Sequence, residues 1–109
     1  MKGTYLGEFE ELVLLAVCVC YDEAYGVAVQ EEIEKQTGRS ASLSAIHTVL
    51  YRLQKKGYLR SRMGGATSER GGRRKRLFTI TEAGKEALIE ARSLREKLWG
   101  VIPDLVFNG

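Results

Sequence analysis

The sequence predicts a mainly α-helical chain with one small β-hairpin, and three patterns in its 109 residues support this fold class. Apolar residues recur at helical spacing in segments that begin near residues 7, 27, 43 and 82. Apolar and polar residues alternate over 58–63 and again over 74–80, as in half-buried strands. The glycine-rich stretch 64–73 separates the two alternating segments and is too long for a tight turn, so we expect a surface loop there.

The first predicted helix runs from Gly7 to Cys20 and is apolar on nearly all sides after its first turn. Glu8, Glu10 and Glu11 stand at its start, where negative charge is favourable near the positive end of the helix dipole. The apolar run 12–21 is about half of the roughly 20 residues that cross a bilayer, so a cytoplasmic protein without a membrane partner is expected. A helix with so little polar surface must be enclosed, and we expect part of it to face a second subunit.

The two cysteines of the chain, Cys18 and Cys20, lie on this helix. They point about 200° apart, so a disulfide between them is not expected. In a reducing cytosol they are expected to act as small core residues. No basic residue near them in sequence would lower a thiol pKa, although the sequence leaves a redox role open.

The second and third predicted helices form a helix-turn-helix. The second spans 27–37 and is followed by Gly38, a residue that favours the end of a helix. The third begins after Ser42, whose hydroxyl can cap the first turn, and stops at Gly57. Two short helices joined by a glycine-containing turn are typical of this motif.

The third helix has two distinct faces. Its buried side is predicted by apolar residues at three- and four-residue spacing, namely Leu43, Ile46, Val49, Leu50 and Leu53. The opposite side carries short polar, aromatic and cationic groups, a mixture suited to base edges and phosphates. Arg52 could instead pair with an acid between helices, and Tyr51 could pack partly into the core through its ring. The predicted DNA contacts are Ser42, Ser44, His47, Thr48, Tyr51, Arg52 and Lys55.

Charge is distributed unevenly along the chain. Residues 1–36 hold eight acids against Lys2 and Lys35, whereas residues 37–80 hold eleven lysines or arginines against Glu69 alone. The formal net charge of +3 therefore comes from the middle of the chain. Such a concentration indicates a polyanionic partner, with nucleic acid favoured over an anionic membrane.

The hairpin carries a cluster of cations in its second half. A solvated charge run is the simpler interpretation, but five cations within seven residues repel one another unless an anion is present. A helix-turn-helix followed by a basic hairpin is a winged helix, and its wing is expected to contact DNA phosphate or the minor groove. The predicted contacts there are Arg70, Arg73, Arg74, Lys75 and Arg76.

The last predicted helix begins after Thr81 and ends before Pro103. Its apolar residues repeat at four- and three-residue spacing, which predicts a dimerisation seam, although the stripe could simply fold back on its own domain. We therefore expect a winged helix-turn-helix DNA-binding domain over 1–80 and a C-terminal dimerisation helix, packed on the same domain, over 81–109. The predicted dimer interface comprises Phe9, Leu12, Leu15, Ala87, Ala91, Leu94, Leu98, Trp99 and Val101.

Five short motifs follow one another along the chain, namely Glu23-Ala-Tyr-Gly-Val-Ala-Val29, Thr37-Gly-Arg-Ser-Ala-Ser-Leu43, Leu50-Tyr-Arg-Leu-Gln-Lys-Lys-Gly57, Glu69-Arg-Gly-Gly-Arg-Arg-Lys-Arg76 and Thr79-Ile-Thr-Glu-Ala-Gly84. In this order and spacing they resemble the PadR-like family of bacterial transcriptional regulators. The resemblance covers nearly the whole chain and implies a homodimer whose recognition helices enter successive major grooves and which represses a promoter, sometimes until a signal relieves it. Two departures are His47, where the family usually has tyrosine, and Leu77-Phe78, where tyrosine is again usual.

The predicted function is that of a sequence-specific DNA-binding transcriptional regulator, a dimeric repressor of a palindromic operator. The alternative is a winged helix used for protein–protein contact or for nonspecific polyanion binding. An enzyme is not expected, because the one histidine has no nucleophile–base partners at usable spacing and no phosphate loop is present. No cofactor and no metal site are expected. A small hydrophobic effector between the subunits, with Phe9, Trp99 and Phe107 as aromatic walls, is a further hypothesis.

Overall fold

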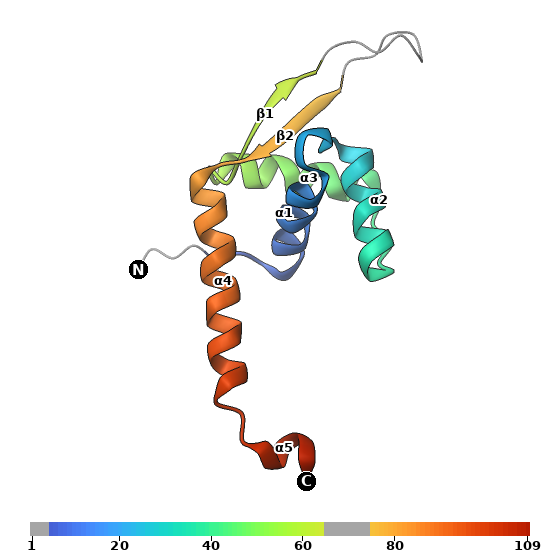
Figure 1. Ribbon diagram of the computed structural model, residues 1–109. Coiled ribbons are helices and arrows are strands. Elements are labelled where there is room, and N and C mark those ends of the chain that lie inside the picture. The colour runs from blue at the N-terminus through green and yellow to red at the C-terminus, as the bar shows by residue number, and fades with distance from the viewer. Residues whose placement is uncertain (1–4, 65–74) are drawn as a thin grey trace.

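The computed structural model describes residues 5–64 and 75–109, and it is mainly helical with a two-stranded antiparallel hairpin, as predicted. Helices α1, α2 and α3 form the body, the hairpin projects from one end of it, and α4 runs away from the hairpin to α5 at its far end (Figure 1). The predicted wing contacts Arg70, Arg73 and Arg74 lie outside the described residues, as does nearly all of the predicted loop. The elements are α1 (Glu8–Cys20), the 3-10 turn η1 (Tyr21–Glu23), α2 (Gly26–Thr37), α3 (Leu43–Lys55), β1 (Leu59–Met63), β2 (Arg76–Ile80), α4 (Glu82–Gly100) and α5 (Asp104–Asn108).

The helix ends follow the local chemistry that the sequence predicts. The hydroxyl of Ser42 accepts a hydrogen bond from the amide of Ala45 at 3.1 Å, which caps α3. Thr81 caps α4 in the same way by accepting from the Gly84 amide at 3.1 Å. Gly57 adopts a φ of +87° just past α3, a conformation that favours glycine and ends the helix there.

The core lies where α1, α2, α3 and the inner face of the hairpin meet. The predicted buried side of α3 is confirmed for four of its five residues, while Leu43 is only half-buried. The expectation that both cysteines are core residues is wrong for Cys18, which is exposed, because it lies on the outer side of α1 together with Leu15 and Val19. The fully buried large side chains are Phe78, Leu14, Ile46, Leu50, Leu53, Val13, Val17 and Val29.

The hairpin is attached to the end of α3 at its base. Its register pairs Leu59 with Ile80 at the base and Met63 with Arg76 toward the tip. The Thr81 hydroxyl donates to the carbonyl of Gly57 at 2.6 Å, and the Thr81 amide donates to the carbonyl of Tyr58 at 3.0 Å. These bonds fix where the hairpin leaves the end of α3.

The C-terminal arm, α4 with α5, extends beyond the body. The Cα radius of gyration is 16.5 Å, against about 13 Å for a compact chain of this length. Ala87 is buried against the body, but from Arg92 onward every residue of α4 is exposed. The sequence did not predict α5, which begins directly after Pro103 and stacks the ring of Phe107 on that of Trp99 at 5.8 Å. Within the described residues, no helix is long and apolar enough to cross a membrane.

Candidate nucleic-acid interface

The outer face of α3 is the largest set of predicted DNA contacts that the structure brings together. All seven predicted residues on this helix are exposed, and the helix carries no acidic residue. Four of them are spaced four, three and four residues apart, which places them in one stripe opposite the buried side: Ser44, Thr48, Tyr51 and Lys55.

His47 and Arg52 flank this stripe and are each in contact with a neighbouring helix. The imidazole of His47 lies directly against Gly26 at the start of α2, where a side-chain Cβ in place of the glycine hydrogen would overlap Nε2. Gly26 must therefore lack a side chain for His47 to occupy this position. A guanidinium nitrogen of Arg52 lies 3.8 Å from a carboxylate oxygen of Glu10 on α1, which is the inter-helix pairing left open by the sequence.

Glu10 is a nearly buried carboxylate that attaches the C-terminal end of α3 to the start of α1. Only 6% of the residue is exposed, and Lys56 donates to its two oxygens at 2.8 and 3.0 Å. The amide of Gly7 donates to the same carboxylate at 2.9 Å. Burial raises the pKa of Glu10, but the hydrogen bonds from Lys56 and Gly7 and the charges of Lys56 and Arg52 outweigh it, so the pKa lies below its ordinary value.

Tyr51 packs partly against the hairpin, as the sequence allowed, and it remains exposed. Its ring meets Phe78 of β2 edge-on, with 5.7 Å between ring centroids, and so contributes to the contact between α3 and the hairpin. The residue is nevertheless 48% exposed. A ring held in this way can present its hydroxyl outward in a fixed direction.

Two of the predicted wing contacts, Lys75 and Arg76, lie among the described residues, and their surroundings differ. Lys75 is exposed, and its ammonium group lies 4.0 Å from the centroid of the Tyr25 ring, within range for a cation–π interaction. Arg76 is half-buried and donates to the hydroxyl of Ser61 at 2.9 Å. Ser61 in turn donates to the side-chain oxygen of Gln54 on α3 at 3.0 Å.

Four residues at this site were missed by sequence reasoning, because their importance comes from contacts between elements. Glu10 and Lys56 are 46 residues apart, and nothing local links them. Ser61 could have been found from the sequence. It is a polar residue on the same face of β1 as the buried Leu59, where an apolar residue is expected. Gln54 lies between the two predicted faces of α3, so periodicity alone assigns it to neither.

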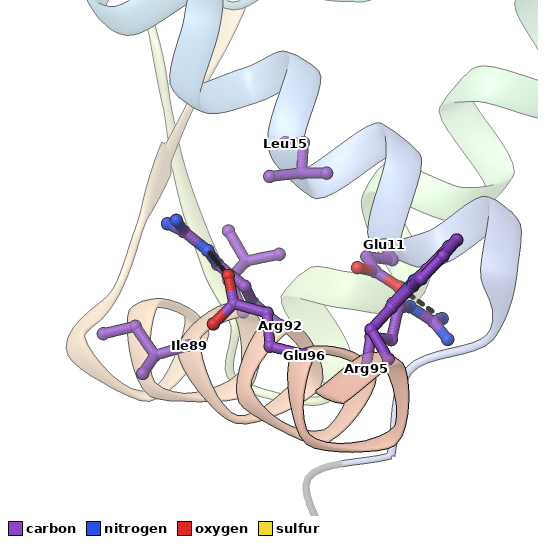
Figure 2. Close-up of a pocket in the computed structure, with 8 residues that line it drawn as sticks. Glu11, Leu15, Ile89, Arg92, Arg95 and Glu96 are labelled. Atoms are coloured by element: carbon purple, nitrogen blue, oxygen red, sulfur yellow. Dashed lines mark hydrogen bonds and ion pairs between the residues drawn. The ribbon is translucent and has the colours of Figure 1, made fainter. Parts of the chain in front are cut away.

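A groove of about 390 Å³ lies between α1 and α4. Figure 2 shows Leu15 of α1 facing α4, where Arg95 pairs with Glu11 at 2.9 Å and Arg92 with Glu96 at 2.9 Å. The groove floor is apolar and its rim is charged. Its lining residues are Glu11, Leu15, Leu88, Ile89, Arg92, Arg95, Glu96 and Trp99.

The predicted dimer residues fall into three groups in the single chain. Ala87 is buried in its own core. Phe9, Leu12 and Ala91 are half-buried, and the ring of Phe9 lies under the guanidinium of Arg39 at 5.3 Å, so it is not part of the groove with Trp99. The exposed group consists of Leu15, Leu94, Leu98, Trp99 and Val101.

The two cysteines lie on different sides of α1, and neither has the features of a reactive thiol. Burial raises the pKa of Cys18, and the charge of Lys85 opposes this only in part. Burial also raises the pKa of Cys20, with a further contribution from Glu32. Both thiols are therefore protonated at neutral pH, which disfavours nucleophilic reactivity. Among residues 5–64 and 75–109, no three His, Cys, Asp or Glu side chains lie together as metal ligands would.

Comparisons with known proteins agree with this geometry. The sequence profile described as "Transcriptional regulator PadR-like family" matches residues 14–90. No curated protein matches the chain by sequence. Among solved structures, a PadR-like transcriptional regulator from Bacillus cereus aligns with a TM-score of 0.71 and 21% identity, over 91% of each chain.

Two other similar structures carry informative descriptions. RosR of H. salinarum aligns with a TM-score of 0.68 and 20% identity, over 91% of this chain and 82% of its own. Bacillus subtilis PadR in complex with operator DNA aligns with a TM-score of 0.62 and 19% identity, over 88% of this chain and 48% of its own. At these identities the structures establish the shared fold, and the profile match spans most of the chain. The chain therefore belongs to the PadR-like family of transcriptional regulators, whose members are regulators rather than enzymes.

Proposed function

We propose that this protein is a homodimeric repressor that binds a palindromic operator, with α3 in the major groove and the hairpin against the backbone or minor groove. The observation that carries this proposal is the outer face of α3. It presents hydroxyl, aromatic and cationic side chains with no carboxylate among them, on a helix whose other side is buried. Such groups can read base edges while neighbouring cations position the helix on phosphates.

The proposed base-reading residues are those of the central stripe, Ser44, Thr48, Tyr51 and Lys55. Ser42 at the N-terminal end of α3 and His47 on the side of α2 are proposed to contact the operator less centrally. Arg52 is proposed to contact phosphate while its pairing with Glu10 keeps it at the other edge. The sequence places Arg70, Arg73, Arg74 and Lys75 in the wing, where they would supply sequence-independent attraction.

Dimerisation is proposed through the outer side of α1 and the C-terminal arm. Leu98 and Trp99 are 62% and 65% exposed, although they lie on a helix with a regular apolar seam. Exposed apolar residues gathered on one element indicate an interface. A second copy of the chain would cover them and would place two recognition helices on one duplex, as a palindromic site requires.

Electrophoretic mobility shift at moderate salt tests this function directly. DNA from beside the protein's own gene should be bound in preference to a scrambled duplex of equal length, and affinity for both should fall as salt rises. Equal affinity for both duplexes would instead indicate a nonspecific polyanion binder. Absence of binding to either would favour a winged helix used for protein contact.

We further propose that the groove between α1 and α4 takes a small hydrophobic effector between the subunits, because its lining is largely apolar and includes Trp99. Quenching of Trp99, the one tryptophan of the chain, is a direct readout. A concentration-dependent quench by one class of apolar ligand, together with weaker operator binding, is expected. A flat response across a broad panel would exclude this effector role.

A further inference from the structure

The side chain of Arg76 lies on the inner face of the hairpin, toward α3. In the register of the sheet, Arg76 and Phe78 belong to the same face, and Phe78 is only 2% exposed. Arg62 on β1 points to the other face and is exposed. Two neighbouring arginines of the wing therefore have different surroundings, although the sequence alone gives both the same charge.

Arg76 begins a chain of hydrogen bonds that crosses both strands and ends on the recognition helix. Its Nη1 donates to Ser61 Oγ at 2.9 Å, and Ser61 Oγ donates to Gln54 Oε1 at 3.0 Å. A serine hydroxyl can accept one hydrogen bond and donate another, so Ser61 uses both capacities here. Donation therefore runs in one direction, from Arg76 through Ser61 to Gln54. Because one end is a charged guanidinium, the first bond is stronger than a neutral one.

The relay gives the hairpin a polar attachment to α3 that is separate from its base. The base is held by Thr81, which binds the carbonyls of Gly57 and Tyr58. In the middle of β2, Phe78 meets Tyr51 of α3 edge-on, and its amide donates to the carbonyl of Ala24 at 2.9 Å. The end of the hairpin beyond Phe78 could still twist and swing, because two-stranded ribbons are weakly constrained. Attachment of Ser61 and Arg76 to Gln54 restrains that motion, so less conformational freedom is lost when wing and helix bind DNA together.

We propose that Arg76 is a positioning residue for DNA recognition, which acts through Ser61 on Gln54 to fix the wing relative to α3, rather than a phosphate contact. The proposal rests on the DNA-binding function proposed above. Under this proposal the preference for one DNA sequence over another depends on Ser61 and Gln54, which are uncharged. A phosphate contact would instead make the charge of Arg76 the essential property.

Substitutions at the uncharged centre of the relay separate these two roles. Dissociation constants are measured for a preferred and a scrambled duplex over a series of salt concentrations. Ser61→Ala should lower the ratio of the two affinities about three- to tenfold, the equivalent of roughly one hydrogen bond, without changing the salt dependence. Gln54→Ala should have a similar effect, and the double variant should add little because both break one relay.

Two control variants test the assignment further. Ser61→Thr keeps the hydroxyl and should show the same DNA preference as the original protein, unlike Ser61→Ala. Arg62→Ala removes the same charge as Arg76→Ala from the outer face, and it should leave the ratio of affinities unchanged. Arg76→Ala should instead lower that ratio as Ser61→Ala does. The proposal is overturned if Ser61→Ala leaves the ratio unchanged while Arg76→Ala reduces the log–log salt slope by about one.

A measurement on the free protein separates failure of the relay from failure of the proposed function. Residual dipolar couplings of the backbone amides report the orientation of β1 and β2 relative to α3 without any DNA. Ser61→Ala should change that relative orientation while the couplings within α3 still fit one rigid helix. If the original protein prefers no duplex over another, the proposed function fails. The dipolar couplings alone then decide whether the relay positions the hairpin. Unchanged orientation in Ser61→Ala would then overturn the relay.

Discussion

Helix α3, the proposed recognition helix, and the C-terminal helix α4 are both amphipathic, but only α3 has its apolar side covered within the subunit. Ile46, Leu50 and Leu53 of α3 have no exposed surface, whereas Leu94 and Leu98 of α4 are 59% and 62% exposed. Apolar residues at the same helical spacing are therefore buried in the core in α3 but exposed to solvent in α4. Periodicity identifies the apolar face of a helix, but it does not say which partner covers that face.

The largest effect is expected when a charge is placed on the uncovered face of α4. Leu98→Asp should weaken dimerisation at least about 100-fold, because a carboxylate would be buried without a partner. Operator affinity should fall with it, since a monomer presents only one recognition helix. Sedimentation equilibrium measures the mass, and Ser93→Asp is the matched control on the polar stripe of α4. Equal association of both variants would show that the seam is not the dimer interface.

The covered region should respond to loss of the carboxylate beneath α3. Glu10→Gln should reduce the free energy of unfolding by about 1.5–3 kcal/mol at pH 7, because Lys56 loses one of its two acceptor oxygens and the negative charge opposite it. Urea denaturation provides the measurement. Glu8→Gln, at an exposed position two residues away, is the control and should cost far less.

The pH dependence of this difference follows from the lowered pKa of Glu10. A carboxyl group whose pKa is lower in the folded state stabilises the protein fully above its unfolded value, near 4.5. That stabilisation is lost as the pH falls from there through the folded value. The stability advantage over Glu10→Gln should therefore shrink below pH 4.5. An advantage that stays constant down to pH 3 would contradict the role of the ionised carboxylate.

Substitutions on the outer face of α3 should affect recognition without affecting the fold. Thr48→Ala should cost about 1–3 kcal/mol of operator binding and relax preference at one base position. Tyr51→Phe removes only the hydroxyl and keeps the edge-on contact with Phe78, whereas Tyr51→Ala removes both. Loss of preference in Tyr51→Ala alone would assign this residue to packing. Competition binding against single-base operator variants provides the measurement.

The smallest change in preference is expected from the wing. Replacing Arg73 and Arg74 together with alanine should weaken binding to all duplexes similarly and should lower the log–log salt slope by about 1.8, or 0.9 for each phosphate contact. Fluorescence anisotropy over a salt series measures this. An unchanged slope would show that neither arginine neutralises a phosphate.

The sequence predicted the parts of the fold that depend on local chemistry. Ser42, Gly57 and Thr81 set the helix ends as expected, since caps and stops act over a few residues. The outer face of α3 also followed from its spacing. Residues that act across elements could not be found in this way: Gln54 and Ser61 become one relay only when β1 folds against α3.

The sequence also could not predict which side of α1 is buried. Its sequence is apolar on nearly all sides, so the pattern did not show that Cys18 would lie on the uncovered side. The short helix α5 was missed because Pro103 predicts a helix end, while the same residue can precede a new helix. Both differences concern exposed parts of the chain, the outer side of α1 and the end of the C-terminal arm.

Selection of preferred sites from a random DNA library tests the central claim most directly, because it requires both a base-reading α3 and a dimer built on α4. The enriched site should be two-fold symmetric, with half-site centres separated by about 10 base pairs, one turn of the duplex. Enrichment of a single unpaired half-site would contradict the proposed dimer. No enrichment over the starting library would contradict sequence-specific recognition by α3.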